Sequence, residues 1–164
     1  SIISMMLSIS YSSFFFKSWS SIRDVLNLIF VADFMGSPAM NLIEAKTKKE
    51  KNYIKIEIKL EDGSIASLKE TKNLNLPKDI IVGVRPENIT ENGSKTGSNY
   101  QYISSKVDII EPAGSDTFVV TKLGNKEVTA RFHSETDVQI GSKVKFSFDL
   151  EKVSYFDLKK WAKD

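Results

Sequence analysis

His133 is the only histidine of the sequence, so a Ser-His-acid triad or a histidine-bearing metal site would have to include it. It closes a strand-like stretch, Arg131-Phe132-His133, and is followed by Ser134 and Glu135. The chain offers no second histidine and no cysteine, and nothing in the sequence marks a nucleophile beside an orienting acid. We therefore interpret His133 as a surface histidine in a turn, and we expect no catalytic residue and no metal ligand in this chain.

The glycines do not form a phosphate-binding loop. Such a loop needs two glycines five positions apart followed by lysine and then serine or threonine, and the dinucleotide-binding motif also needs closely spaced glycines. The glycines stand at positions 36, 63, 83, 93, 97, 114, 124 and 141, which satisfies neither pattern. The sequence therefore predicts no nucleotide-hydrolysing site and no cofactor in this chain.

The most distinctive stretch is Ile80–Ile89, an apolar run that ends abruptly in Arg85-Pro86-Glu87. Its length and its flanking Pro77 and Pro86 predict one buried strand. Proline cannot donate to a sheet ladder, so the strand should end where the two opposite charges begin. Arg85 and Glu87 then form either an ordinary surface ion pair or a contact surface for a partner.

Alternating strands flank this stretch and predict a β domain. Residues 53–60 place four apolar side chains on one face and three charged ones on the other. Tight turns are expected at Asp62-Gly63 and Gly124-Asn125, and wider turns or loops at 48–51, 91–99 and 111–115. Further strands are expected at 65–68, 103–109, 117–123, 127–132, 144–150 and 153–157, with Phe146 and Phe148 in the core.

The fold class is therefore all-β, with OB-like barrels of short antiparallel strands and a short N-terminal helix. The helix is predicted over 27–35 from apolar residues at helical spacing, with Gly36 as its stop. We divide the chain into an apolar, serine-rich leader (1–26), a helix and connector (27–41) and a β domain (42–164) with two barrel-like halves, about 42–90 and 100–158. The leader has no basic start as a secretory signal would, and an interfacial amphipathic segment is its alternative reading.

The charge balance does not favour nucleic acid as a partner. Lysine and arginine together number 23 and aspartate and glutamate 21, so the net charge is only +2. The aromatic and basic residues that could line a single-strand nucleic-acid surface are few: Tyr100, Tyr102, Lys106 and Lys122.

Four segments together resemble one family, the ATP-binding subunits of carbohydrate ABC importers of the maltose-importer type. The segment Phe30 to Asn41, which includes Phe34, Gly36, Ser37, Pro38, Met40 and Asn41, resembles the family's connector between its ATPase and regulatory domains. Gly83-Val84-Arg85-Pro86-Glu87-Asn88-Ile89 resembles a motif of the regulatory domain, with Asn88 where histidine is common. Val107 to Ser115, with Glu111 and Gly114, resembles the start of the transport-associated OB segment, and Phe156-Asp157 resembles its closing Phe-Asp-Pro.

The resemblance implies a regulatory and dimerising OB-type domain of an importer whose parent protein couples ATP hydrolysis to sugar uptake. ATP and magnesium would be bound by the ATPase domain, whose motifs this chain lacks, so we expect a non-enzymatic fragment or truncated product. Implied partners are a second copy of the regulatory domain, permease subunits reached through the ATPase domain, and a regulatory protein. The implied location is the cytoplasmic face of the cell membrane. Two alternatives stay open: an oxyanion-binding module and an OB-fold binder of single-stranded nucleic acid.

Overall fold

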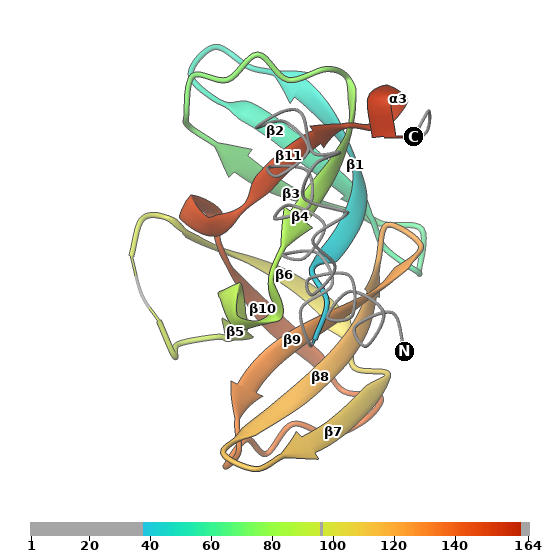
Figure 1. The fold of residues 1–164 in the computed structure, drawn as a ribbon, viewed down its shortest axis with the longest axis vertical. Helices are drawn as coiled ribbons and strands as arrows, with labels where there is room; N and C mark the ends of the chain where they lie inside the picture. The colour runs from blue at the N-terminus through green and yellow to red at the C-terminus, as the bar shows by residue number, and fades with distance from the viewer. Residues whose placement is uncertain (1–37, 96, 162–164) are drawn as a thin grey trace, which may run out of the picture. The chain divides into compact units, whose positions relative to one another are not determined.

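Short antiparallel strands build residues 38–95 and 97–161, the part of the chain that the computed structural model describes (Figure 1). Every strand pairing in this part is antiparallel, which confirms the all-β prediction. The predicted helix over 27–35 and the leader lie outside the described residues. The elements in chain order are β1 (Asn41–Lys49), β2 (Ile54–Lys59), β3 (Ile65–Glu70), β4 (Asp79–Val84), the 3₁₀ turn η1 (Pro86–Asn88), β5 (Ile89–Glu91), β6 (Tyr100–Lys106), β7 (Ile109–Ala113), β8 (Asp116–Leu123), β9 (Lys126–His133), β10 (Lys143–Asp149), the 3₁₀ turn η2 (Leu150–Lys152), β11 (Ser154–Asp157) and the helix α3 (Leu158–Trp161).

The strands form three sheets whose order differs from their order in the chain. The first sheet runs β11-β4-β1-β2-β3, the second β5-β10-β6 and the third β7-β8-β9. Strand β5, from the first predicted half, pairs with β10, and β11, from the second, pairs with β4. Each half thus contributes a strand to a sheet of the other half, and the division into two barrel-like halves stays a prediction.

The expected alternation is clearest in β2. Ile54, Ile56 and Ile58 are buried there, while the intervening lysines and glutamate reach the surface. Strand β4 differs, because five of its six residues, Ile80–Val84, are buried. Since successive side chains point to opposite faces, both faces of β4 are covered, which confirms the prediction of one buried strand.

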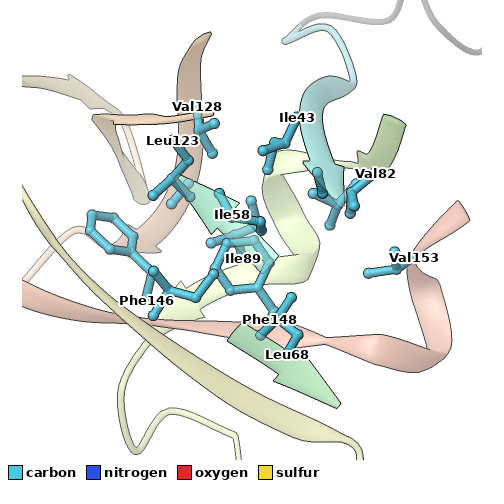
Figure 2. Close-up of a cluster of buried hydrophobic side chains, with 14 of the residues drawn as sticks. Ile43, Ile58, Leu68, Val82, Ile89, Leu123, Val128, Phe146, Phe148 and Val153 are labelled. Atoms are coloured by element: carbon cyan, nitrogen blue, oxygen red, sulfur yellow. The ribbon is translucent and has the colours of Figure 1, made fainter. Parts of the chain in front are cut away.

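One hydrophobic core joins the three sheets (Figure 2). Ile43, Ile58, Leu68 and Val82 enter it from the first sheet, Ile89, Phe146 and Phe148 from the second, and Leu123 and Val128 from the third. The ring of Phe146 also packs against that of Phe132, with centroids 5.6 Å apart. Phe146 and Phe148 are fully buried, which confirms their assignment to the core.

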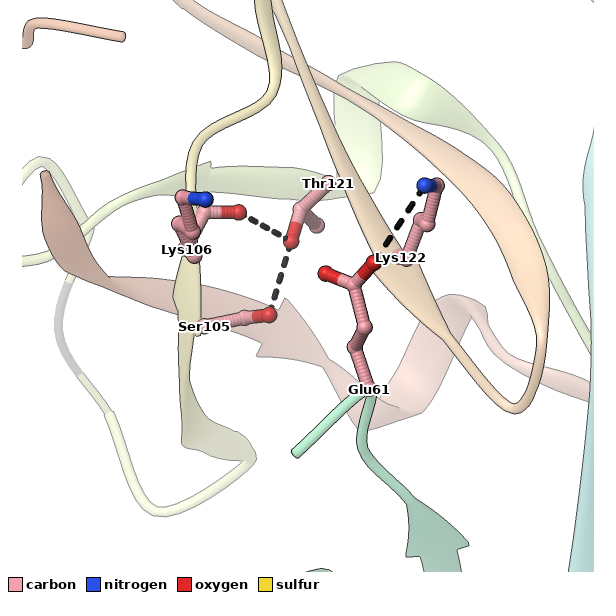
Figure 3. Close-up of polar contacts among 5 residues, drawn as sticks. All are labelled: Glu61, Ser105, Lys106, Thr121 and Lys122. Atoms are coloured by element: carbon pink, nitrogen blue, oxygen red, sulfur yellow. Dashed lines mark hydrogen bonds and ion pairs between the residues drawn. The ribbon is translucent and has the colours of Figure 1, made fainter. Parts of the chain in front are cut away.

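A chain of hydroxyl groups crosses from the third sheet to the second (Figure 3). The Oγ1 atom of the fully buried Thr121 lies 2.7 Å from both the carbonyl oxygen of Lys106 and the Oγ atom of Ser105. Threonine has one hydroxyl hydrogen, so Thr121 donates to the Lys106 carbonyl and accepts from Ser105. The next residue, Lys122, points outward and pairs with Glu61 at 3.3 Å.

Several local predictions were wrong. Residues 41–49 form β1, which was not predicted, and Lys48 and Lys49 belong to its exposed end rather than to a loop. The predicted turn at 111–115 is shorter, since β7 continues to Ala113 and contains Pro112. Proline is tolerated there because β7 is an edge strand whose outer side needs no donor. The short helix α3 was not predicted either.

The single α-helix found in residues 38–95 and 97–161 is too short and too polar to cross a bilayer.

Candidate functional site

Residues from three distant motif segments meet at Gly83. Strand β4 places Gly83 between Leu42 of β1 and Ser154 of β11. A Cβ atom at Gly83 would lie 2.6 Å from Cε2 of Phe156 and 3.0 Å from Sδ of Met40. Real contacts of a Cβ are longer than this, so the Phe156 ring and the Met40 side chain occupy the space that the glycine leaves free.

Asn41 fixes the start of β1 to the third sheet. Its Nδ2 donates to the carbonyl oxygen of Thr129 at 2.9 Å, and its Oδ1 accepts from the Thr129 amide at 2.8 Å. Strand β9 lies at the edge of its sheet, so Asn41 bonds the backbone groups that a further strand would otherwise bond. Asn41 is only 6% exposed, so water does not compete freely for these two bonds.

The charged end of the 80–89 stretch folds into η1. Pro86 occupies the first turn and is buried, and the Asn88 amide donates to the Arg85 carbonyl at 2.9 Å. Arg85 and Glu87 are half-buried, and η1 packs against β9.

On β9, a 2.7 Å ion pair with Asp116 raises the pKa of the Arg131 guanidinium, and the nearby charge of Glu87 raises it further. Glu87, at the charged end of the 80–89 stretch, therefore contributes to the contact between η1 and β9 of the third sheet.

The remaining motif residues lie elsewhere. Glu111 is exposed on the edge strand β7, and Gly114 has φ +70° in the turn that follows, with open space where a side chain would be. Pro38 is half-buried at the start of the described chain, and Phe34, Gly36 and Ser37 lie outside it.

Two grooves lie in this part of the molecule. One is beside the Gly83 cluster, which consists of Met40, Gly83 and Phe156, and the other is over the first sheet. One of about 400 Å³ runs between the connector end and β9, lined by Pro38–Leu42, Lys126, Glu127 and Thr129. The other, of about 320 Å³, lies over charged residues of β1 and β2, including Glu44, Lys46, Glu57 and Lys59. The Lys55–Glu57 pair at 2.8 Å raises the pKa of Lys55 and lowers that of Glu57.

The arrangement is suited to packing and binding. Within residues 38–95 and 97–161, no group of histidine, aspartate and glutamate side chains could hold a metal ion. His133 is exposed at the end of β9, and its Nδ1 accepts from the Glu135 amide at 3.3 Å, which confirms its place in a turn.

The residues considered for nucleic-acid binding are partly engaged within the protein. The Tyr100 hydroxyl donates to Asp149 at 3.4 Å, and the charge of Lys122 is paired with Glu61. Tyr102 is 42% exposed, and Lys106 is also exposed.

Phe156 belongs to a motif of the sequence, but its contact with Gly83 was not predicted. No contact was predicted for Thr129 either. The Thr129 contact uses backbone atoms, which leave no trace in residue type.

Two family models match the chain. The model described as the MalK OB fold domain matches residues 36–89, and the model described as the TOBE domain matches residues 82–156. These ranges include the Gly83 cluster and η1, but they leave residues 1–35 unmatched.

Curated relatives are similar over most of the chain. The uncharacterized ABC transporter ATP-binding protein YcjV of Escherichia coli O157:H7 is 30% identical over 130 residues, which are 79% of this chain and 34% of that protein. The oligosaccharides import ATP-binding protein MsmX of Bacillus subtilis is 31% identical over 133 residues, 79% of this chain and 35% of that protein. The sn-glycerol-3-phosphate import ATP-binding protein UgpC of Cupriavidus metallidurans is 29% identical over 132 residues, with the same two shares.

The chain spans about a third of the length of these relatives. Among solved structures, the cytoplasmic molybdate-binding protein ModG aligns with a TM-score of 0.47 and 16% identity, over 71% of this chain and 94% of that one.

Proposed function

We propose that this chain, which carries the OB and TOBE domains of carbohydrate ABC importer ATP-binding subunits, serves as the regulatory and dimerising domain of such a subunit. The parent protein would couple ATP hydrolysis to sugar uptake. ATP and magnesium would be bound by an ATPase domain outside the matched region, and the catalytic role would lie there as well.

The observation that supports this proposal best is the anchoring of the connector end. Met40 and Phe156 both lie over Gly83, and Asn41 holds Thr129 by two hydrogen bonds. Residues that precede Met40 would therefore be attached to a rigid point shared by the first and third sheets. Such a point would give a moving ATPase domain a firm attachment to this domain.

The mechanism follows from two-state linkage. In a homodimer, regulatory domains would stay in contact while the ATPase domains open and close. A regulatory protein that binds across the two domains in only one of these states would shift the equilibrium by its difference in affinity. Permease subunits would contact the ATPase domain, which would place the chain at the cytoplasmic face of the membrane.

The first test is the mass of the chain in solution, measured by light scattering after size-exclusion chromatography. We expect a species of twice 18.5 kDa, about 37 kDa, whose share rises with concentration. The same measurement on a variant without residues 1–26 should give a dimer too, because the leader has no part in the proposed contact. A monomer mass at every concentration, 18.5 kDa for the full chain and correspondingly less for the shortened variant, would contradict dimerisation through this domain.

A further inference from the structure

One side-chain hydrogen bond links the two edge strands of the first sheet. Strands β11 and β3 stand at opposite ends of the sheet order β11-β4-β1-β2-β3. Nevertheless, the hydroxyl of Tyr155 on β11 donates to Oε2 of Glu70 on β3 at 2.7 Å. Within residues 38–95 and 97–161, β3 pairs with β2 and β11 with β4, and no backbone ladder joins β3 to β11. We call this contact between β3 and β11, which side chains alone make, the seam.

The carboxylate at the seam is buried and fully engaged. Glu70 is 2% exposed, and its second oxygen, Oε1, accepts from the Lys72 amide at 2.8 Å. Burial, followed by the contact with Glu70, raises the pKa of the Tyr155 hydroxyl well above its ordinary value, so Tyr155 keeps its proton and remains the donor. Without this donor, Oε2 of the buried carboxylate would have lost its hydrogen bond, which is costly unless water can reach it.

A second contact crosses the same seam. Nζ of Lys72, just after β3, donates to the carbonyl oxygen of Leu150 in η2 at 3.3 Å. The end of β3 thus touches the chain both before β11 and within it. Beyond β11, α3 packs on β11 and β4 (Figure 1).

The other attachments of β11 are limited. Its four residues pair with β4 alone, and Phe156 lies over Gly83 on the face opposite to Tyr155. A segment held by one short ladder and a few side chains is the kind that opens locally at lower free energy than the rest of a domain.

We propose that residues 154–161, comprising β11 and α3, form a strap that the Tyr155–Glu70 bond holds against the first sheet and that opens as a unit when this bond breaks. The preceding turn η2 stays in place, because Leu150 and Val153 are buried in the core. The strap separates from β3 and β4, while the second and third sheets and the β1–β2–β3 ladders keep their pairing. Opening lets water hydrate Glu70, which offsets the lost tyrosine donor. The strap gives the domain a closed and an open form, and this inference rests on geometry independent of the proposed function.

The test is amide hydrogen exchange on the full chain carrying Tyr155→Phe, which keeps the ring and removes only the donor. We expect the β11 amides that bond to β4 to exchange roughly tenfold faster than in the unmodified chain, the factor that corresponds to loss of a hydrogen bond to a charged group. The amides of β8 and β9, in the third sheet, should keep their rates.

Tyr100→Phe is the matched control. Tyr100 also donates to a carboxylate, that of Asp149, but β6 and β10 are already joined there by a backbone ladder, in which these two residues stand opposite each other. Loss of this hydroxyl should leave β11 exchange within about twofold of its original rate, since no seam depends on it.

Glu70→Gln provides a second variant. If Tyr155 and Glu70 act as one latch, the double variant should open β11 no faster than the faster single variant. Three results would overturn the proposal: unchanged β11 exchange in Tyr155→Phe, equal acceleration of β11 and of β8–β9, or fully additive effects of the two substitutions. If Glu70→Gln does not fold, the first two criteria still decide.

Discussion

At the scale of single residues, Gly83 is required by packing and not by backbone conformation. The glycines with positive φ lie in turns and at the loop position Gly97, whereas Gly83 lies within β4. What excludes a side chain is the approach of Cε2 of Phe156 to 2.6 Å from the position of a Cβ atom. The substitution of Gly83 therefore reports directly on the contact between two motif segments.

Gly83→Ala should destabilise the chain by about 1–3 kcal/mol, the usual cost of overpacking. Phe156→Leu shortens the clashing side chain, so the cost of Gly83→Ala should shrink in that background. Urea unfolding of the two single variants and the double variant measures both quantities. Equal costs of Gly83→Ala in the two backgrounds would refute the contact.

Tyr155 gives a pH prediction whose sign follows from its raised pKa. Above about pH 10 the unfolded tyrosine loses its proton while the folded one retains it, so the unfolded state binds fewer protons. Stability from this group is thus fully present below pH 10 and decreases as the pH rises further, by at most about 1.4 kcal/mol per pH unit.

Tyr155→Phe removes this group, so the stability of the variant should fall less steeply above pH 10 than that of the unmodified chain. Chemical denaturation at a series of alkaline pH values gives the two slopes. Parallel slopes would show that Tyr155 ionises equally in both states.

At the scale of elements, the turns show how strands from different sheets are positioned. Gly124 and Asn125 both have positive φ, +59° and +62°, as the tight turn between β8 and β9 requires. Gly124 also lies directly against β1, since a Cβ atom there would come 2.7 Å from the carbonyl oxygen of Glu44. Gly63, in the β2–β3 turn, has φ +82° with open space around it.

Gly63→Ala and Gly124→Ala therefore separate backbone strain from close approach. The first should cost about 1 kcal/mol, the price of a left-handed alanine. The second should cost about 3 kcal/mol, because the overlap with β1 adds to the same strain. Thermal or urea unfolding gives the difference, and equal losses of stability would contradict the docking of this turn on β1.

Two carboxamide side chains bond the free backbone N–H and C=O groups of an edge strand in the same manner. Asn41 bonds both backbone groups of Thr129, and Gln101 bonds both backbone groups of Lys69, at 2.7 and 2.6 Å. The Asn41 bonds are shielded, whereas those of Gln101 lie at the surface. Water can replace the second pair but not the first.

Asn41→Leu should accordingly cost about 2 kcal/mol and Gln101→Leu less than about 1 kcal/mol. Urea unfolding of both variants checks the order. If Gln101→Leu is the more damaging change, burial does not govern the strength of these contacts.

The elements also show what the sequence can predict. Strand β2 and the β8–β9 hairpin follow from strict alternation and from Gly124-Asn125. Strand β1 was missed because its inward positions include Asn41, Ala45 and Thr47, which carry little hydrophobic signal. The end of β7 was misjudged because Pro112 reads as a turn unless the strand is known to be an edge.

At the scale of the whole molecule, the motif residues were predictable, but most of their contacts were not. Met40, Gly83 and Phe156 are separated by dozens of residues. The β1–β4 ladder brings Met40 to Gly83, and the pairing of β11 with β4 adds Phe156. Neither Tyr155 nor Glu70 marks its partner in the sequence either. Such contacts depend on topology, which local patterns do not determine.

The most direct test of the account is whether this domain can act within an importer subunit. Residues 36–164 would replace the corresponding region of MsmX, and oligosaccharide uptake would be measured in Bacillus subtilis cells that lack their own MsmX. We predict that the chimera supports uptake, whereas MsmX truncated before this region supports far less. A chimera that accumulates to the normal level, yet gives no more uptake than the truncated protein, would contradict the assignment of this chain as a regulatory domain of such a subunit.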